Sequence, residues 1–450
     1  MNLRTALLPP LLALAATAVA ESPLKVGLFD VDASPPIGSP LAYDTCDEVL
    51  QPLSCRGLVL VGGESPIVLC AIDWIGVANE GHEAFREALA AAAGTTPDRV
   101  AVHALHQHDA PVCDFSADRL LAQHGIAHLR YDSVFARRVI EGAADSVKEA
   151  LAKAQPVTHL GLGEAIVEKV ASNRRILGPD GIVKVTRYTA TADPAVRAEP
   201  VGTIDPVLKM WSLWRDEEPI VAVTYYATHP QSYYRTGKAN PDFPGIARNT
   251  REDATGIPHV HFNGAGGNIG AGKWNDGSPE NRQVLADRVA AGMAAAWEDT
   301  ERIPISADDV SWHSVAVELP AAPHLEEDVL EETIGSDEAS ILERSSAASH
   351  LAWLRRTRSG KAIDVGCLHL GNARVLHLPG ELFVEYQLAA HGMRPDLFVA
   401  MAAYGDYGPG YIGTEIAYAE GGYETSPGAS RVAPGVEAVL MDTIQRLLRD

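Results

Sequence analysis

Cysteine and basic side chains are scarce in this sequence of 450 residues. The five cysteines are odd in number and include no CxxC pair, so they indicate neither a disulfide framework nor a zinc-thiolate site. Cys46 and Cys55 could pair in an oxidising compartment. The 37 lysines and arginines face 59 acidic residues, which gives a formal net charge of −22. So acidic a chain disfavours nucleic acid and anionic membranes as partners.

Long apolar runs are missing after the first residues. The N-terminal segment MNLRTALLPPLLALAATAVA carries one arginine and an apolar stretch and ends in Ala18-Val19-Ala20, which is typical of a cleavable secretory signal. We therefore expect a signal peptide over residues 1–20, with cleavage after Ala20, and a secreted or periplasmic protein without a transmembrane segment. The oligomeric state cannot be read from the sequence.

No low-complexity linker divides the rest of the chain, so residues 21–450 are predicted to form one domain. An apolar hairpin, a helix and an apolar strand follow one another three times, starting near Gly57, Val207 and Ile363. The turns GGES, RDEE and GN lie between the apolar runs, as hairpins require. This pattern predicts an α/β fold of layered mixed β-sheets flanked by helices, built from repeated hairpin-helix-strand units.

Polar residues follow the strands of all three repeats. They are Asp73, His229 and Glu381 after the hairpins, and His106 with His108, Asn268 and the Asp406–Tyr411 loop after the last strands. Each of these alone is more typical of a structural position than of a ligand. Because α/β folds build sites from polar groups at the ends of strands, the combination predicts that these ends converge on one site.

The stretch AVHALHQHDAP, residues 101–111, is an apolar strand that ends in two histidines spaced i, i+2. On a strand, such a pair lies on one face with its side chains roughly 6–7 Å apart. Both histidines could then bind one metal ion, or one could bind it while the other assists.

Several motifs occur together and in a fixed order along nearly the whole chain: RGLVLV with IDWIG, ALHQHDAP, LGLGEA with SNRR, ATHP, DFPG, NGAGGN, LPGE and YIGTEIAYAEGGYE. In these motifs the chain resembles the N-terminal catalytic domain of the neutral/alkaline ceramidase family. The members of that family are zinc amidases that cleave the N-acyl bond of ceramide. The resemblance predicts a ceramidase-like zinc hydrolase domain over residues 21–450.

The resemblance implies roles for individual residues. Zinc would be held by His106, His229, Glu381 and Tyr411, a shell of two nitrogens and two oxygens. His108 and Tyr423 match residues that stabilise the oxyanion, and Arg174 matches an arginine that lines the pocket. Asp73 is a candidate to orient an imidazole from behind. Zn²⁺ would then polarise the carbonyl group and activate water for attack.

The sequence departs from the family at the hexapeptide GDVSPN, which is GNIGAG here, residues 267–272. A serine nucleophile is excluded at this position, which favours metal-activated water. Asn268 replaces the family's aspartate and can form a hydrogen bond but cannot act as a base. The glycines either let the backbone approach the substrate or form a flexible turn. The chain stops soon after Tyr423, so the family's C-terminal immunoglobulin-like domain is not expected.

These observations predict a secreted, zinc-dependent amidase of lipid metabolism that takes a small-molecule or lipid-like acyl amide. Aromatic residues make up only 6% of the chain and the C-terminal domain is not expected, so ceramide need not be the substrate. A zinc esterase or lactonase is an alternative, since the same chemistry attacks either carbonyl. A non-catalytic binding protein is another: the loss of GDVSPN favours it mildly, and the four ligand positions oppose it.

Overall fold

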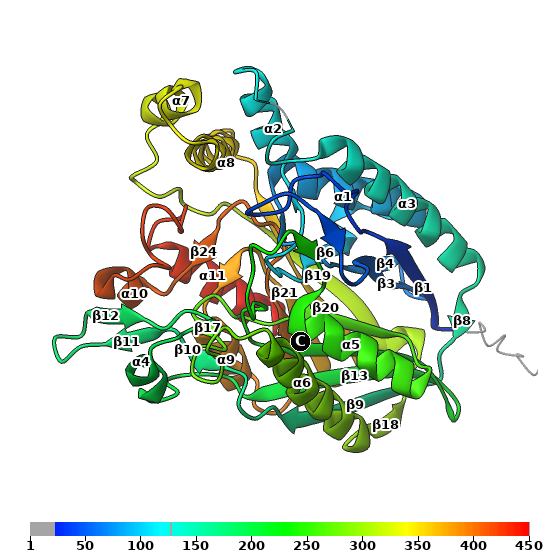
Figure 1. The fold of residues 1–450 in the computed structure, drawn as a ribbon. Helices are drawn as coiled ribbons and strands as arrows, with labels where there is room; N and C mark the ends of the chain where they lie inside the picture. Colours follow the sequence, from blue (N-terminus) through cyan, green and yellow to red (C-terminus); the bar gives the residue numbers. More distant parts are fainter. Residues whose placement is uncertain (1–22, 127, 450) are drawn as a thin grey trace, which may run out of the picture.

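The first repeat forms a mixed sheet with the strand order β6-β4-β3-β1-β8 (Figure 1). The computed structural model describes residues 23–126 and 128–449, so the predicted signal peptide lies outside the described part of the chain. Strands β3 and β4 form the predicted antiparallel hairpin, and β6 pairs with β4 in parallel. The elements are β1 (Lys25–Asp32), β3 (Ser54–Val61), β4 (Ile67–Ile72), α1 (Asn79–Ala93), β6 (Val100–Ala104), α3 (Ser133–Ala152) and β8 (Gln155–Pro156).

The second repeat has the same plan, with the strand order β16-β14-β13-β9-β18. The hairpin β13–β14 is antiparallel, and β16 returns parallel to β14. The elements are β9 (His159–Ile166), β13 (Val207–Arg215), β14 (Glu218–Tyr226), α5 (Asp242–Thr255), β16 (His259–Asn263), α6 (Glu280–Glu298) and β18 (Glu301–Pro304).

The third repeat forms the sheet β19-β20-β21-β23, again with an antiparallel hairpin and a parallel return strand. Its elements are β19 (Val310–Val317), β20 (Ile363–Leu370), β21 (Ala373–His377), α9 (Val384–Met393), β23 (Phe398–Ala402) and α11 (Val436–Leu447). All three predicted hairpin-helix-strand units are therefore present, and the predicted mixed α/β architecture is confirmed.

The remaining helices and strands connect the three sheets and line their ends. They are β2 (Glu48–Val49), β5 (Gly76–Val77), β7 (Val112–Cys113), α2 (Phe115–Ala122), β10 (Ser172–Asn173), β11 (Arg175–Leu177), β12 (Val183–Thr186), α4 (Pro194–Ala198), β15 (Lys238–Ala239), β17 (Ile269–Gly270), α7 (Glu327–Gly335), α8 (Ile341–Arg358), β22 (Glu381–Leu382), β24 (Tyr411–Ile412) and α10 (Glu415–Glu420). Among the described residues, no helix combines the length and apolar character needed to cross a bilayer.

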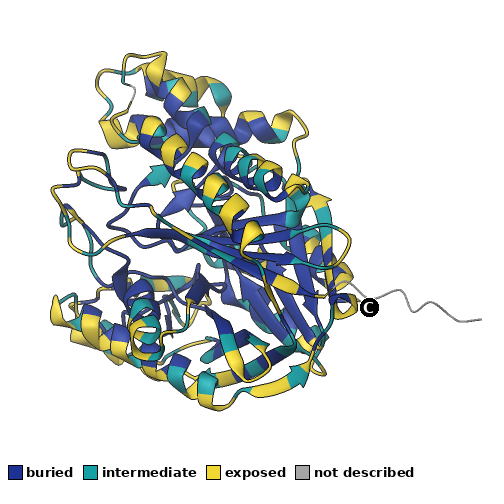
Figure 2. Cartoon of the chain, turned by 90° about the vertical axis from the view of Figure 1, so that its right-hand side faces the viewer, coloured by how far each residue is buried: buried dark blue, intermediate teal, exposed yellow. Residues whose placement is uncertain are grey.

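The inner faces of the three sheets pack against one another in a common core. Leu58 of the first sheet, Val221 of the second and Val375 of the third belong to one buried cluster. On the outer faces, each sheet is covered by two helices: α1 and α3, α5 and α6, and α9 and α11. Figure 2 shows buried strands in the centre and exposed residues on the outer surfaces of the helices. Because both faces of each sheet are covered, the strands read as continuous apolar runs.

The return strands β6, β16 and β23 meet at their carboxyl ends. The backbone N–H of Ala104 donates to the carbonyl of Tyr404 at 2.9 Å, and that of Ala403 donates to the carbonyl of Asn263 at 2.9 Å. The Asn263 side chain donates in turn to the carbonyl of Leu105. The predicted convergence of these strand ends is therefore confirmed.

The two histidines of the AVHALHQHDAP stretch do not lie on a strand. Strand β6 ends at Ala104, and His106 has φ 66°, a left-handed conformation that breaks the alternation of a strand. The expectation of a pair on one strand face is therefore wrong. The N–H groups of Leu105 and His106 bond the carbonyls of Ile72 and Trp74, and these contacts hold the turn.

All five cysteines are buried and free. The pairing of Cys46 with Cys55 is not formed. The sulfur nearest to Cys55 Sγ belongs to Cys70 at 3.5 Å, whereas Cys46 Sγ bonds the carbonyl of Glu48 at 3.6 Å. The thiols therefore pack as small apolar side chains.

Asp73 joins the first repeat to the second. Its carboxylate accepts hydrogen bonds from Arg248 Nη1 and Nη2 at 2.7 and 2.9 Å and from the N–H and hydroxyl of Ser54. Burial opposes ionisation, but Arg248 keeps the pKa of the Asp73 carboxyl below its ordinary value. The expectation that Asp73 orients an imidazole is wrong, because its oxygens bond a guanidinium and a serine instead.

We predict that Asp73→Ala lowers the free energy of unfolding by about 3–5 kcal/mol, because it leaves the buried Arg248 without a counter-charge. Urea unfolding followed by circular dichroism measures this loss, and Asp73→Ala/Arg248→Met should recover part of it. The matched control is Glu218→Ala, which removes the exposed partner of Arg215 and should leave the midpoint unchanged. Equal midpoints for Asp73→Ala and the control would contradict the prediction.

Candidate metal centre

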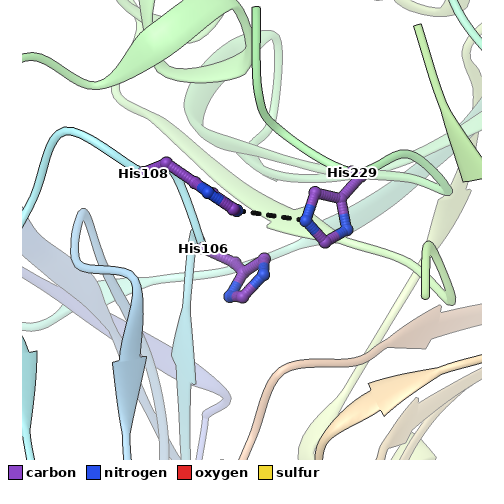
Figure 3. A group of neighbouring side chains, drawn as sticks. All are labelled: His106, His108 and His229. Atoms are coloured by element: carbon purple, nitrogen blue, oxygen red, sulfur yellow. Dashed lines mark hydrogen bonds between the residues drawn. The ribbon is translucent and has the colours of Figure 1, made fainter. Parts of the chain in front are cut away.

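Three buried histidines face one another at the ends of the first two repeats. His106 and His108 lie in the loop after β6, and His229 follows β14. One ring nitrogen of each lies within 4.8 Å of the others (Figure 3). The Nε2 atoms of His108 and His229 are 3.1 Å apart. The cluster thus has the side chains and the spacing to hold a metal ion.

Glu381 completes this cluster from the third repeat. His106 Nδ1 donates to the carbonyl of Ile75 at 2.5 Å, which leaves Nε2 facing Glu381 Oε2 at 3.2 Å. His229 Nδ1 lies 3.7 Å from the same oxygen. The other carboxylate oxygen of Glu381 accepts a hydrogen bond from Tyr407 Oη at 2.7 Å. Glu381 Oε2 therefore points toward the two histidines.

Tyr411 lies beside Glu381 because β22 and β24 pair in parallel, with these two residues as Cα partners. Its ring is parallel to that of His229, with 6.2 Å between the centroids. Its hydroxyl accepts a hydrogen bond from Arg174 Nη1 at 3.0 Å. The structure thus brings together all four residues that the resemblance names as ligands, with His108 as a fifth neighbour.

Burial sets the charge states in this cluster. It lowers the pKa of His108 and His229 well below the ordinary value, with His106 adding to the effect, so both rings are neutral near pH 7. Burial opposes ionisation of Glu381, but the neighbouring His106 imidazole and the hydroxyl groups of Tyr407 and Tyr411 lower the pKa of its carboxyl. Neutral imidazoles beside one carboxylate form a donor set suited to a divalent cation.

Three buried atoms that could bind a metal ion have no hydrogen-bond partner, which also supports a divalent cation here. They are His106 Nε2, His229 Nδ1 and Glu381 Oε2. Native proteins rarely leave such atoms unpaired. Zinc bonds of ~2.0–2.1 Å in a tetrahedron place ligand atoms roughly 3.3 Å apart, close to the 3.2 and 3.7 Å between these atoms. The residues present therefore fit a zinc-sized ion.

Two donor sets share His106 and differ in the nitrogen that His229 supplies. One joins His229 Nδ1 with Glu381, and the other joins His229 Nε2 with His108. One nitrogen of His229 can serve one ion, so His108 either binds the metal or stands next to it.

A cavity of about 390 Å³ opens onto this centre. Its lining includes His106, His108, Glu381, Tyr411 and Tyr423. The Tyr423 side chain is 42% exposed, so it borders the opening. An amide carbonyl that enters the cavity can therefore reach the histidine cluster and these hydroxyl groups together.

Arg174 lies behind the cavity wall. It is buried, with Nε 3.2 Å from Glu424 Oε1, and its guanidinium carbon lies 5.7 Å from the Tyr411 ring and 5.6 Å from the Tyr423 ring. The residues that line the cavity do not include Arg174. The expectation that it lines the pocket is therefore wrong, because Arg174 contacts Tyr411 from the protein side.

The glycine-rich loop packs under Glu381. A Cβ at Gly267 would lie 2.2 Å from the Glu381 carbonyl oxygen, and the Gly267 N–H donates to the carbonyl of Leu382 at 2.8 Å. The Asn268 side chain accepts from the N–H of Val384 at 2.9 Å and donates to Glu385 at 2.8 Å, so it caps the start of α9. The glycines thus allow close packing of the loop against Glu381, a role that neither expectation for the loop, contact with substrate or a flexible turn, included.

Sequence reasoning missed three aromatic residues of the centre. Tyr404 stacks on His106 with 4.5 Å between ring centroids, and Tyr43 stacks on His108 with 5.4 Å. Tyr407 bonds Glu381. The run YGDYGPGY holds Tyr404 and Tyr407, and its spacing of tyrosines and glycines was a usable signal; nothing in the sequence around Tyr43 indicated a role.

We predict that Gly267→Ala displaces Glu381, because the new methyl group overlaps the Glu381 backbone. The free energy of unfolding should fall by about 1–3 kcal/mol, and the protein should retain less zinc after dialysis. Gly392→Ala is the matched control, since a Cβ there meets open space in α9, and helix propensity favours alanine. Equal zinc content in the two variants would contradict this account.

Comparison with known proteins finds ceramidases of the same fold. The structure is similar to that of neutral ceramidase from Pseudomonas aeruginosa, with a TM-score of 0.68 and 16% identity, covering 95% of this chain and 74% of that one. It is also similar to a ceramidase complexed with C2, with a TM-score of 0.67 and 15% identity, covering 95% and 75%. No family model and no curated protein sequence matches the chain. The chain thus has the neutral ceramidase fold, as its motifs predicted.

Proposed function

We propose that this protein is a zinc-dependent hydrolase that cleaves acyl amides. The observation that carries the proposal is the group of unpartnered donors on His106, His229 and Glu381, which faces a cavity and has Tyr411 beside it. The structural neighbours are ceramidases, which supports an amide as the substrate. The predicted signal peptide supports an extracytoplasmic site of action.

His106, His229, Glu381 and Tyr411 would hold the ion, which when bound supplies Lewis-acid polarisation of the carbonyl and a lowered pKa for water. The Ile75 carbonyl fixes the His106 tautomer, because it accepts the Nδ1 proton and leaves Nε2 as the donor atom. Tyr407 holds the second oxygen of Glu381 and so fixes the rotation of the carboxylate. These contacts orient the donor atoms before metal or substrate arrives.

His108 and Tyr423 would stabilise the negative charge that develops on the carbonyl oxygen. Both side chains line the cavity, and Tyr43 stacks on the His108 ring and restricts its rotation. A donor held in place before the reaction needs no reorganisation as the charge develops. Arg174 would act as a positioning residue, because its hydrogen bond to the Tyr411 hydroxyl orients the phenol.

We predict that chelation abolishes turnover of short N-acyl amides and lowers the melting temperature, and that added zinc restores both. The thermal shift follows from binding to the folded state alone, about 4 kcal/mol when free zinc is about 1,000 times its dissociation constant. Metal analysis, amide turnover and differential scanning calorimetry on one sample measure all three. Full activity after complete metal removal would overturn the zinc assignment.

We predict that the variants His106→Ala and His108→Ala distinguish a metal ligand from a residue that assists catalysis beside the metal. His106→Ala should lose zinc, because His106 is common to both donor sets. His108→Ala should keep zinc and lose a factor on the order of 10²–10³ in kcat if its ring donates to the oxyanion. Metal content and kcat measured side by side decide between the sets: equal zinc loss in the two variants would make His108 a ligand and remove Glu381 from the primary set.

A further inference from the structure

Two arginines at the mouth of the cavity, Arg130 and Arg235, have no carboxylate partner among the described residues. Both line the cavity, and their guanidinium carbons lie 5.5 and 5.4 Å from the centre of the Tyr43 ring. The Arg130 guanidinium donates to the carbonyl of Leu41 at 3.3 Å, and Arg431, a third arginine of the lining, donates to the carbonyl of Gly408 at 2.8 Å. No carboxylate oxygen of the described residues lies within 4.0 Å of the Arg130 or Arg235 guanidinium.

The chain has 59 acidic and 37 basic residues, so carboxylates outnumber cations. Many arginines elsewhere in the described part of the chain pair with carboxylates, as Arg56 does with Asp30 at 3.0 Å and Arg248 with Asp73 at 2.7 Å. Two like charges near one ring repel each other, and an anion between them would relieve that repulsion. Neither guanidinium forms a direct ion pair with a described carboxylate; Asp114 and Glu381 line the same cavity, and Asp44 acts on Arg235 over a longer distance.

The backbone of Arg235 is held in a costly conformation. Its φ of 66° lies in the left-handed region, which costs on the order of 1–2 kcal/mol for a residue with a side chain. Asp109 maintains it: Oδ1 accepts from the Arg235 N–H at 2.9 Å, and Oδ2 accepts from the Thr236 hydroxyl at 2.8 Å. Because Asp109 directly follows His108, this bracing fixes Arg235 relative to the metal centre.

Tyr43 separates the arginines from the centre. Its ring stacks on His108 at 5.4 Å and contacts Tyr234 at 4.8 Å. Each guanidinium is thus one aromatic ring away from His108. An anion bound at the arginines would belong to a substrate whose charged group is several bonds from the amide that reaches the histidines.

Large aliphatic side chains are few in the rest of the lining. Besides the aromatic rings, the only side chains of the lining with aliphatic carbon beyond a methyl group and no polar atom are Ile75, Val112 and Leu342. Ser345, Ser346 and Ser349 lie on the α8 side. A long alkyl chain would bury little apolar surface here, so the cavity favours a short or polar amide.

We propose that the cavity takes an acyl amide that carries an anionic group, a carboxylate or a phosphate ester, bound by Arg130 and Arg235. This proposal rests on the amidase function proposed above. In the reaction, water adds its oxygen to the carbonyl carbon, the C–N bond breaks, and the released amine takes up a proton. Guanidinium groups match both anions through paired N–H donors.

The test uses the zinc-loaded protein and matched amides. The carboxylate arm compares 4-acetamidobutanoate with the uncharged 4-acetamidobutanamide, and the phosphate arm compares 3-acetamidopropyl phosphate with 3-acetamidopropanol. We expect at least one charged amide to exceed its neutral partner about tenfold or more in kcat/KM, as 1.4 kcal/mol of charge-assisted hydrogen bonding would give. The arm with the larger preference identifies the anion.

Arg130→Gln and Arg235→Gln should each reduce this preference for the charged amide about tenfold, mainly through KM, because the chemistry takes place elsewhere. Arg137→Gln is the matched control: this arginine also stacks on an aromatic ring, that of Phe115 at 4.0 Å, but does not line the cavity. It should keep the preference of the unmodified protein.

Two outcomes separate the two proposals. Equal turnover of charged and neutral amides, unchanged in preference by the arginine variants, would overturn the anion site and leave the amidase in place. No turnover of any amide would overturn the amidase. Calorimetric binding of 4-acetamidobutanoate and 3-acetamidopropyl phosphate to the zinc-loaded protein and to Arg130→Gln/Arg235→Gln then decides the anion site: binding of either anion that the double variant loses supports it, and binding of neither overturns it.

Discussion

The carboxyl ends of β6, β16 and β23 are hydrogen-bonded to one another, and the candidate metal centre is built on the loops that leave this junction. Asn263 forms two of the hydrogen bonds at this junction. Its backbone carbonyl accepts from the Ala403 N–H, and its side chain donates to the Leu105 carbonyl. A buried strand end cannot leave these groups unpaired. No repeat can satisfy them alone, so the site forms only when all three sheets are in place.

Polar contacts between neighbouring repeats close the arrangement into a ring. Arg86 of α1 bonds Asp364 of β20, and Arg248 of α5 bonds Asp73 after β4. Gln387 of α9 completes the ring by bonding Asp205, just before β13. Each helix thus ties its own sheet to the next one. The candidate ligands His106, His229 and Glu381 come from three repeats and lie more than a hundred residues apart in sequence, so packing and these bonds rather than local chain geometry bring them together.

The repeats and the meeting of the ligand residues could be predicted because periodic apolar runs and polar strand ends are local signals. The conformation of His106 could not, because its left-handed φ is stabilised by the carbonyls of Trp74 and Ile75. Asp73 was misread for a similar reason: a carboxylate after a buried strand can bond an imidazole or a guanidinium, and Arg248, 175 residues away, decides which. The position of the glycine loop could not be predicted either, because it depends on close packing: only the fold shows that Gly267 lies against Glu381.

The candidate metal centre bears on which reaction the protein can carry out, and the cavity bears on which compounds can reach that centre. Tyr404 and Tyr407 flank His106 and restrict the orientation of its ring. Any carbonyl compound that reached this point would meet the same groups, and the likeness to ceramidases at 16% identity shows the fold alone. Discrimination between substrates must therefore come from the residues that line the cavity. On our proposal, the guanidinium groups of Arg130 and Arg235 attract an anion by Coulomb forces, and the few aliphatic side chains of the lining give an alkyl chain little to pack against. On the same proposal, one scaffold keeps its hydrolytic centre while the composition of its cavity changes the class of amide admitted.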